Sequence, residues 1–318
     1  MIFGDLSLIQ ITVSILLALC LDRTIGEVSR WHPLVLWGGW VVKLEKQFNG
    51  GRYWQGVFAW AVVVIPVLSI LGIILWLSSS YSMAVIISSI CLYFSIAWRS
   101  LREHGLAVMT SLNIALPPAQ QAVARIVSRD TSQMTRVDVI RATIESMLEN
   151  GADAIFAPLF WFLIAGPFGA VGYRLVNTLD AMWGYRTKQY NFFGAFAARA
   201  DDVLNYLPAR LTALSYSLLG NTASAFSCWR RQAPACISPN AGPVMCAGAG
   251  SLEVCLGGGA SYNGRWCEKP LMGSGREDLN ANDIERSISL VDRSVITWTL
   301  ILVGCTVAFS AAEVMSGV

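Results

Sequence analysis

Four long apolar runs predict membrane-spanning helices. They are Leu6–Leu21, Val57–Leu77, Met83–Ala97 and Val295–Ala312. An α-helix needs about 20 apolar residues to cross the hydrocarbon core of a bilayer, so the second run is long enough by itself and the first and third depend on their flanks. The first run is preceded by Asp5 rather than by basic residues and is followed by no small-residue cleavage site. We therefore interpret it as a retained anchor and not as a signal peptide.

A fifth apolar segment, Ala154–Val176, has Gly166-Pro167 at its centre. Proline removes a backbone donor and clashes with the preceding helical turn, so a straight helix through this point is disfavoured. We expect two half-helices that enter the membrane and return to the side from which they came. A kinked membrane span is the alternative.

The basic residues predict how the chain is oriented in the membrane. All 23 lysines and arginines lie in two segments, Arg23–Arg52 and Arg99–Arg293. The segments Met1–Asp5, Ser78–Ser82 and Glu313–Val318 contain none. Because basic loops are retained in the cytoplasm, four spans place both basic segments there and both termini in the periplasm. The expected location is a bacterial cytoplasmic (inner) membrane, with the catalytic region facing the cytoplasm.

These patterns predict an all-α, polytopic membrane protein with about four transmembrane helices and a large helical, loop-rich cytoplasmic region. Residues 1–98 would form three spans and a cytoplasmic loop, residues 99–293 the catalytic region, and residues 294–318 the last span. The composition agrees, since 54% of residues are hydrophobic and the mean hydropathy is +0.52. A net charge of +2 argues against nucleic acid as a partner. The eight cysteines form no C-x-x-C pair and there are two histidines, which argues against zinc and favours reduced thiols.

The segment Glu145–Arg210 concentrates ionisable side chains in a chain with only 14% charged residues. Crowded charge is costly unless it is paired, bound to metal or set against a ligand. Glu145, Glu149 and Asp153 have the i, i+4, i+8 spacing that places them on one face of a helix. They predict a Mg²⁺ site, because hard oxygen ligands suit that ion and it often bridges to phosphates. A solvated acidic stripe paired with Arg141 is the alternative.

More candidates follow in the same segment. Asp201 and Asp202 are adjacent, so only one can face a site, and Asp202 is preferred because Arg199 and Asn205 are expected on the adjacent turn. Basic side chains suit phosphate, although they also anchor proteins at membrane surfaces; those of this segment are Arg186, Lys188, Arg199 and Arg210. No phosphate-loop motif is present, and the Gly257-Gly258-Gly259 triplet lacks the following lysine.

Ordered motifs run along nearly the whole chain. They are Asp22 with Gly26 and His32-Pro33, Arg99-Ser100-Leu101, Val127–Thr131, Glu145 with Glu149-Asn150 and Asp153, Ala157–Phe160, Asn177–Asp180 with Gly184-Tyr185, Ala198-Arg199 with Asp201-Asp202, Asn205 and Pro208–Arg210, Ser238–Gly242, Leu256–Gly258 and Tyr262–Gly264. This set resembles the CbiB/CobD family, the adenosylcobinamide-phosphate synthases of cobalamin biosynthesis.

The resemblance implies an ATP-dependent ligase. It would join a propionate carboxylate of adenosylcobyric acid to (R)-1-amino-2-propanol phosphate, or a related amino alcohol, through an acyl phosphate. Mg²⁺ at Glu145, Glu149 and Asp153 would neutralise the ATP phosphates, and Asp180 or Asp202 would accept a proton from the attacking amine. The expected ligand-binding residues are Arg186, Lys188, Arg199, Arg210, Asn150, Asn205 and Asn240. Expected partners are the corrinoid, the amino-alcohol phosphate, the lipid bilayer and later membrane enzymes of cobalamin assembly.

Two other classes fit less well. A non-enzymatic accessory or sensor protein resembling AmpE would have little reason to carry the acids, asparagines and arginines between Glu145 and Arg210. A transporter predicts ionisable residues inside its spans and repeated halves. The four apolar runs contain no charge, and no repeat is visible.

Overall fold

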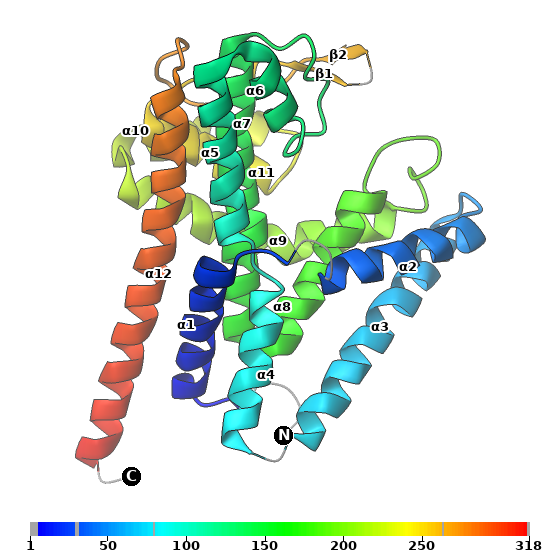
Figure 1. Ribbon diagram of the computed structural model, residues 1–318, viewed down its shortest axis with the longest axis vertical. Helices are drawn as coiled ribbons and strands as arrows, with labels where there is room; N and C mark the ends of the chain where they lie inside the picture. Colours follow the sequence, from blue (N-terminus) through cyan, green and yellow to red (C-terminus); the bar gives the residue numbers. More distant parts are fainter. Residues whose placement is uncertain (1–5, 29–31, 79, 263, 317–318) are drawn as a thin grey trace. The chain divides into compact units, whose positions relative to one another are not determined.

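The computed structural model describes residues 6–28, 32–78, 80–262 and 264–316. Met1–Asp5, the N-terminal segment without lysine or arginine, and Asn263 of the Tyr262–Gly264 motif lie outside the described residues. The described chain is almost entirely helical, which confirms the all-α class (Figure 1). Strands β1 (Ala260–Tyr262) and β2 (Arg265–Cys267) form a short antiparallel hairpin in which Ala260 pairs with Cys267.

Most helices follow one another closely along the chain, and the longest connection, between α11 and α12, carries the β-hairpin. The helices are α1 (Leu8–Ile25), α2 (Pro33–Phe48), α3 (Tyr53–Leu77), α4 (Tyr81–Tyr93), α5 (Trp98–Ile114), α6 (Leu116–Val123), α7 (Arg136–Gly151), the π-helix η1 (Ala152–Phe156), α8 (Ala157–Trp183), α9 (Ala195–Leu219), α10 (Thr222–Gln232), the 3₁₀-helix η2 (Ala233–Ala235), α11 (Ala241–Leu252) and α12 (Ala281–Ser316).

The chain forms two compact units. Unit 1 comprises Met1–Ala97, Ala157–Asn205 and Thr299–Val318, and unit 2 comprises Trp98–Phe156 and Tyr206–Trp298. The contacts thus place residues 157–205 with the N-terminal and C-terminal segments, whereas the division expected from sequence placed them with the central region.

Unit 1 has an apolar core where α2, α3, α8 and α9 meet. The buried core residues are Trp37, Val41, Ala59, Val63, Val64, Leu175, Leu179, Trp183, Phe193 and Ala197. The indole nitrogen of Trp37 donates to the carbonyl oxygen of Val63 at 3.1 Å, so its polar atom is satisfied inside this core. Each large apolar side chain that is removed from water contributes about 1.5–3 kcal/mol, so this cluster holds the segment after α8 against α3.

Hydroxyl groups join apolar helices elsewhere in unit 1. The hydroxyls of Thr12 in α1 and Thr306 in α12 are 2.7 Å apart. The Tyr93 hydroxyl at the end of α4 donates to the carbonyl oxygen of Gly26 at 2.6 Å. Such polar contacts tie helices together where apolar surroundings provide no competing water.

Among the residues that the structure describes, five helical segments have the length and composition needed to cross a membrane. They are Leu8–Ile25, Tyr53–Leu77, Tyr81–Ile114, Arg136–Trp183 and Ala281–Glu313. Four of them coincide with the predicted apolar runs, the first run beginning two residues before its helix, and the remaining one contains Gly166-Pro167. The polytopic membrane character is therefore confirmed.

The predicted interruption at Gly166-Pro167 is present. The backbone leaves helical geometry at Ala165 (φ −135°, ψ 20°) and Gly166 (φ 57°, ψ −146°), and Figure 1 shows α8 bent into two arms. The positive φ of Gly166 is one that glycine adopts at little cost. A Cβ atom on Gly169 would fall on the carbonyl oxygen of Trp161, although eight residues of straight helix span about 12 Å. The start of the second arm therefore lies against the first arm.

This turn bears on the predicted orientation in the membrane. A chain that reverses at Gly166 keeps both flanks on one side, as four crossings require. Five straight crossings would separate the two termini and divide the basic residues between the two sides. The inner-membrane location and the periplasmic termini stay predictions.

Gly169 provides a test of the turn. The Gly169→Ala variant should lose about 1–3 kcal/mol of stability, because its new methyl group meets backbone that cannot move aside cheaply. The thermal unfolding midpoint of the purified protein in detergent measures this loss. Gly304→Ala is the matched control, since a Cβ there meets nothing within 4 Å and alanine favours a helix over glycine. An equal midpoint for the two variants would contradict the close approach of the arms.

Unit 2 is built around α7 and α11, whose residues are mostly buried. α7 begins at a capping box, in which the Thr135 hydroxyl accepts from the amide of Asp138 and the Asp138 carboxylate accepts from the amide of Thr135. α11 has glycines where neighbouring helices come close. A Cβ on Gly250 would lie 2.7 Å from the Cα of Ala225 in α10, so this contact requires glycine.

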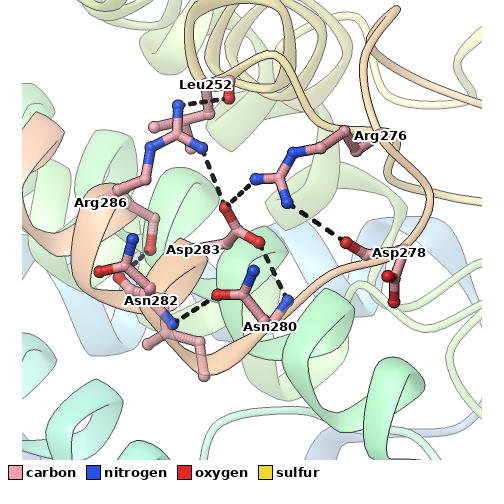
Figure 2. Close-up of polar contacts among 9 residues, drawn as sticks. Leu252, Arg276, Asp278, Asn280, Asn282, Asp283 and Arg286 are labelled. Atoms are coloured by element: carbon pink, nitrogen blue, oxygen red, sulfur yellow. Dashed lines mark hydrogen bonds and ion pairs between the residues drawn. The ribbon is translucent and has the colours of Figure 1, made fainter.

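A buried carboxylate ties the start of α12 to the end of α11. Asp283 is 1% exposed, and its Oδ1 accepts from Arg276 at 2.7 Å and from Arg286 at 2.9 Å (Figure 2). Its Oδ2 accepts from the amide of Asn280 at 3.0 Å, and Arg286 also donates to the carbonyl oxygen of Leu252 at 2.7 Å. Both carboxylate oxygens of Asp283 are engaged, and Arg276 and Arg286 both donate to this carboxylate. We therefore assign this cluster a structural role.

Candidate functional site

A buried carboxylate lies where α8 and α9 meet in unit 1. Asp201 accepts hydrogen bonds from the amide nitrogen of Asn177 at 3.2 Å and from that of Asn205 at 3.0 Å. The hydroxyl of Tyr173 donates to the side-chain oxygen of Asn205 at 2.9 Å, which turns the Asn205 NH₂ group toward Asp201. We call Tyr173, Asn177, Asp201 and Asn205 the Asp201 network.

Helical spacing explains why these four side chains meet. Tyr173 and Asn177 are four residues apart on α8, and Asp201 and Asn205 are four apart on α9, so each pair shares a helix face. Asp201 is 9% exposed and Asn205 is 3% exposed. Burial raises the pKa of Asp201, the amides of Asn177 and Asn205 act to lower it, and the charge of Asp202 adds to the rise.

Asp180 and Asp202 border the Asp201 network. Asp180 is half-buried and interacts electrostatically with Asp201 and Asp202. A Cβ on Gly184 would fall on the Asp180 carboxylate, so glycine lets the backbone close over this side chain. Desolvation raises the pKa of Asp202, and the charge of Arg186 acts to lower it. Three acids and one arginine therefore gather in this part of unit 1.

The two residues expected beside Asp202, Arg199 and Asn205, make other contacts in the structure. Asn205 donates to Asp201, four residues before it, and Arg199 lies over the ring of Tyr53 at 5.9 Å. One residue along a helix rotates a side chain by about 100°, so Asp201 faces α8 while Asp202 is exposed. The i, i+4 spacing of Asp201 and Asn205 was the available signal for this pair.

Unit 2 holds a second buried carboxylate. Glu145 of α7 is 1% exposed, forms an ion pair with Arg129 through Oε2, and accepts from the amide of Gly257 through Oε1 at 2.7 Å. Gly257, Gly258 and Gly259 all have positive φ, at 80°, 87° and 108°. A Cβ on Gly257 would fall on the carbonyl oxygen of Pro270, so the triplet is a tight turn that offers its amide to Glu145.

The Arg129-Asp130 loop connects Glu145 to the β-hairpin. Burial acts to lower the pKa of Arg129, but Glu145 and Tyr262 outweigh it and the pKa is raised. Asp130 accepts from the Ser261 hydroxyl at 3.0 Å and from the amide of Gly264 at 2.7 Å. Arg129 and Asp130 belong to the Val127–Thr131 motif, but their positions in the sequence do not predict a contact with Glu145 or with the β-hairpin.

The predicted metal ligands Glu145, Glu149 and Asp153 are not gathered as one set. Both oxygens of Glu145 are engaged, and Glu149 is exposed, within electrostatic range of Lys269. Asp153 lies in the π-helix η1, whose wider turn shifts it from the face that an α-helix would give it. Within the described ranges, no group of three or more His, Cys, Asp or Glu side chains could hold a metal ion.

Three of the predicted binding residues, Arg210, Asn240 and Asn150, have partners within unit 2. Arg210 donates to the side chain of Asn240 and to the carbonyl oxygen of Pro239, both at 3.3 Å, and its guanidinium lies 3.4 Å from the ring centroid of Tyr206. Asn150 donates to the hydroxyl of Ser146 at 2.8 Å. The predicted site residues of unit 1 are Asp180, Arg186, Lys188, Arg199, Asp202 and Asn205, and those of unit 2 are Glu145, Glu149, Asn150, Asp153, Arg210 and Asn240.

Comparison with known proteins places the chain in a family. The family model described as CobD/Cbib protein matches residues 15–291. A cobalamin biosynthesis protein CobD from Stutzerimonas stutzeri is 49% identical over 299 residues, which cover 92% of this chain and 97% of the relative. Proteins of the same description from Chromobacterium violaceum and Rhodobacter capsulatus are 46% and 39% identical, over 93% and 85% of this chain and 96% and 88% of the relatives. No solved structure matches. The resemblance seen in the motifs is confirmed, and the chain belongs to the CobD/CbiB family.

Proposed function

We propose that this protein is a membrane ligase of cobalamin biosynthesis that forms an amide between a propionate carboxylate of adenosylcobyric acid and an amino-alcohol phosphate, driven by ATP. Family membership and the names of the relatives support the pathway. The observation that carries the chemistry is the gathering of Asp180, Asp201 and Asp202 beside Arg186.

The reaction needs an activated acid and a neutral amine. The carboxylate oxygen would attack the γ-phosphorus of ATP, releasing ADP and leaving an acyl phosphate. The amine nitrogen would then attack the acyl carbon, the C–O bond to phosphate would break, and the products would be the amide and inorganic phosphate. Because the amino alcohol arrives as an ammonium ion, a base must take one proton before the attack and another from the amide nitrogen.

The acids of unit 1 suit this proton transfer. Three nearby carboxylates attract an ammonium group, and Asp180 is half-buried rather than fully enclosed. Asp201 is held by two amide donors, so its carboxylate keeps its position as charge changes around it. We assign the proton to the Asp180–Asp201 pair as a unit, since interacting carboxylates titrate together. Arg186 beside Asp202 is suited to a phosphate of ATP or of the amino alcohol.

Magnesium binding is compatible with the proposal because this ion needs few protein ligands. Mg²⁺ is commonly held by one or two carboxylates together with substrate phosphates and water, so a set of three acids is not required. Glu149 is the predicted ligand that remains exposed. When bound, the ion would neutralise charge on the transferred phosphoryl group.

The test is a reconstitution. Purified full-length protein in detergent should convert adenosylcobyric acid, aminopropanol phosphate and Mg-ATP to a corrinoid amide with one ADP per product, measured by liquid chromatography and mass spectrometry. Omitting the amine should abolish the corrinoid product. Absence of both products from protein with an intact thermal unfolding transition would refute the ligase and favour an accessory role.

A further inference from the structure

An open pocket lies in unit 1, between the C-terminal end of α2 and the segment that follows α8. Its volume is about 330 Å³, and it is lined by Glu45, Lys46, Asn49, Gly51, Lys188 and Gln189. Small-molecule sites typically measure about 300–1,000 Å³, so this pocket has room for a compact ligand.

Side-chain hydrogen bonds hold the two walls of the pocket together. Glu45 is 7% exposed, and its Oε1 accepts from Gln189 Nε2 at 3.0 Å and from the Tyr190 hydroxyl at 2.8 Å. Asn49 Nδ2 donates to the carbonyl oxygen of Gln189 at 3.4 Å, and its Oδ1 accepts from the amide of Gly51 at 3.1 Å. The pocket is therefore a built feature, with α2 bonded to the opposite segment.

The pocket lining carries more positive than negative charge, with two lysines and the single carboxylate of Glu45. Lys46 and Lys188 are both exposed at its lining, one on each wall, and neither takes part in an ion pair with an acid among the described residues. Glu45 also lines the pocket, but neutral donors engage it, and burial together with the Glu45 charge raises the pKa of Tyr190 to about 12, so that hydroxyl stays protonated. Two ammonium groups at one concave site attract an anion.

We infer that Lys46 and Lys188 bind a phosphoryl group in this pocket, carried either by a soluble phosphate monoester or by a lipid headgroup. Lysine binds phosphate as a compact point charge with three donors, which suits a ligand approached from two walls. Lys188 is a phosphate ligand predicted from the sequence, and the pocket adds Lys46. The monoester version builds on the proposed function, because an amino-alcohol phosphate is such a ligand, but binding can be measured without ATP or corrinoid.

The experiment uses full-length protein with Lys46→Gln, Lys188→Gln and the double variant. Lys43→Gln is the matched control, because Lys43 is exposed on the same helix and does not line the pocket. Phosphoethanolamine, a phosphate monoester, is titrated by calorimetry into protein in neutral phosphatidylcholine nanodiscs. A charge-assisted contact contributes about 1.5–3 kcal/mol, so each pocket variant should bind at least about tenfold more weakly, and Lys43→Gln should bind like wild type.

A second arm distinguishes the source of the phosphoryl group. Native mass spectrometry counts phosphatidylglycerol retained by each variant from mixed nanodiscs. If wild type binds the monoester and both pocket variants lose this binding, the ligand is the soluble phosphate. If wild type does not bind the monoester but retains phosphatidylglycerol, and the variants lose this lipid, the ligand is the headgroup. Binding and retention that are unchanged in the double variant, with an unchanged thermal transition, would overturn the inference even if the ligase assay succeeds. A failed ligase assay with lysine-dependent binding would instead refute only the proposed reaction.

Discussion

Replacing Glu145 with alanine should lower the free energy of unfolding by about 3–5 kcal/mol, because the partly buried Arg129 would lose its counter-ion. The side chains of Arg129 and Glu145 are 12% and 2% exposed, so water cannot replace the lost partner well. The amide of Gly257 would also lose its acceptor. Denaturant titration in detergent, followed by tryptophan fluorescence, measures the change.

Two companion variants separate charge from shape. Glu145→Gln keeps an acceptor for Gly257 and should destabilise less than Glu145→Ala. The double variant Glu145→Met, Arg129→Met replaces the pair by apolar side chains and should recover part of the loss, since a buried pair contributes little net stability over apolar residues. Equal losses for all three would contradict a role for the ion pair.

The same variants test the metal role predicted for Glu145. A metal ligand predicts that Glu145→Gln raises the Mg²⁺ concentration needed for turnover and leaves stability nearly unchanged. The structural role predicts instead that Glu145→Gln lowers stability and leaves the Mg²⁺ requirement nearly unchanged. Arg129 and Gly257 already engage both carboxylate oxygens of Glu145.

Features that depend on composition or on neighbouring residues were predictable from sequence. The apolar runs identify membrane helices because helix length must match bilayer thickness. The break at Gly166 was predictable for a local reason, since proline at 167 cannot continue the hydrogen bonding of the preceding turn. Gly257 to Gly259 were conspicuous, but their function as a turn against Glu145 depends on a partner 112 residues away.

Features that depend on helix phase or on pairing across loops were not predictable. The π-helix at Ala152–Phe156 has no simple sequence signature, and it moves Asp153 off the face expected for an α-helix. The contact of Asn205 with Asp201 rather than with Asp202 depends on a step of one residue along α9, which is a rotation of about 100°. The Arg129–Glu145 pair joins residues 16 apart across the start of α7, and spacing alone does not reveal such a contact.

Asp201 is the residue for which the proposed chemistry makes the strongest claim. The Asp201→Asn variant should lower kcat about 10²–10⁴-fold, the usual contribution of a general base, because the Asp180–Asp201 pair would lose one of its two carboxylates. Asp202→Asn, at the exposed neighbouring position, should lower kcat less than about tenfold. Comparable losses in the two variants would return the catalytic assignment to Asp202.

Stability against pH provides a readout that does not require turnover. Burial raises the pKa of Asp201 above its unfolded value, so the folded state binds this proton more tightly than the unfolded chain does. The resulting stabilisation is complete below the unfolded pKa of about 3.9 and is lost as pH rises through the folded pKa. Wild type should therefore lose stability over that window relative to Asp201→Asn, which cannot ionise there. Unfolding midpoints measured from pH 4 to pH 8 give the difference between the two proteins, and a constant difference would mean that Asp201 titrates as an ordinary exposed carboxyl and could not serve as the proposed base.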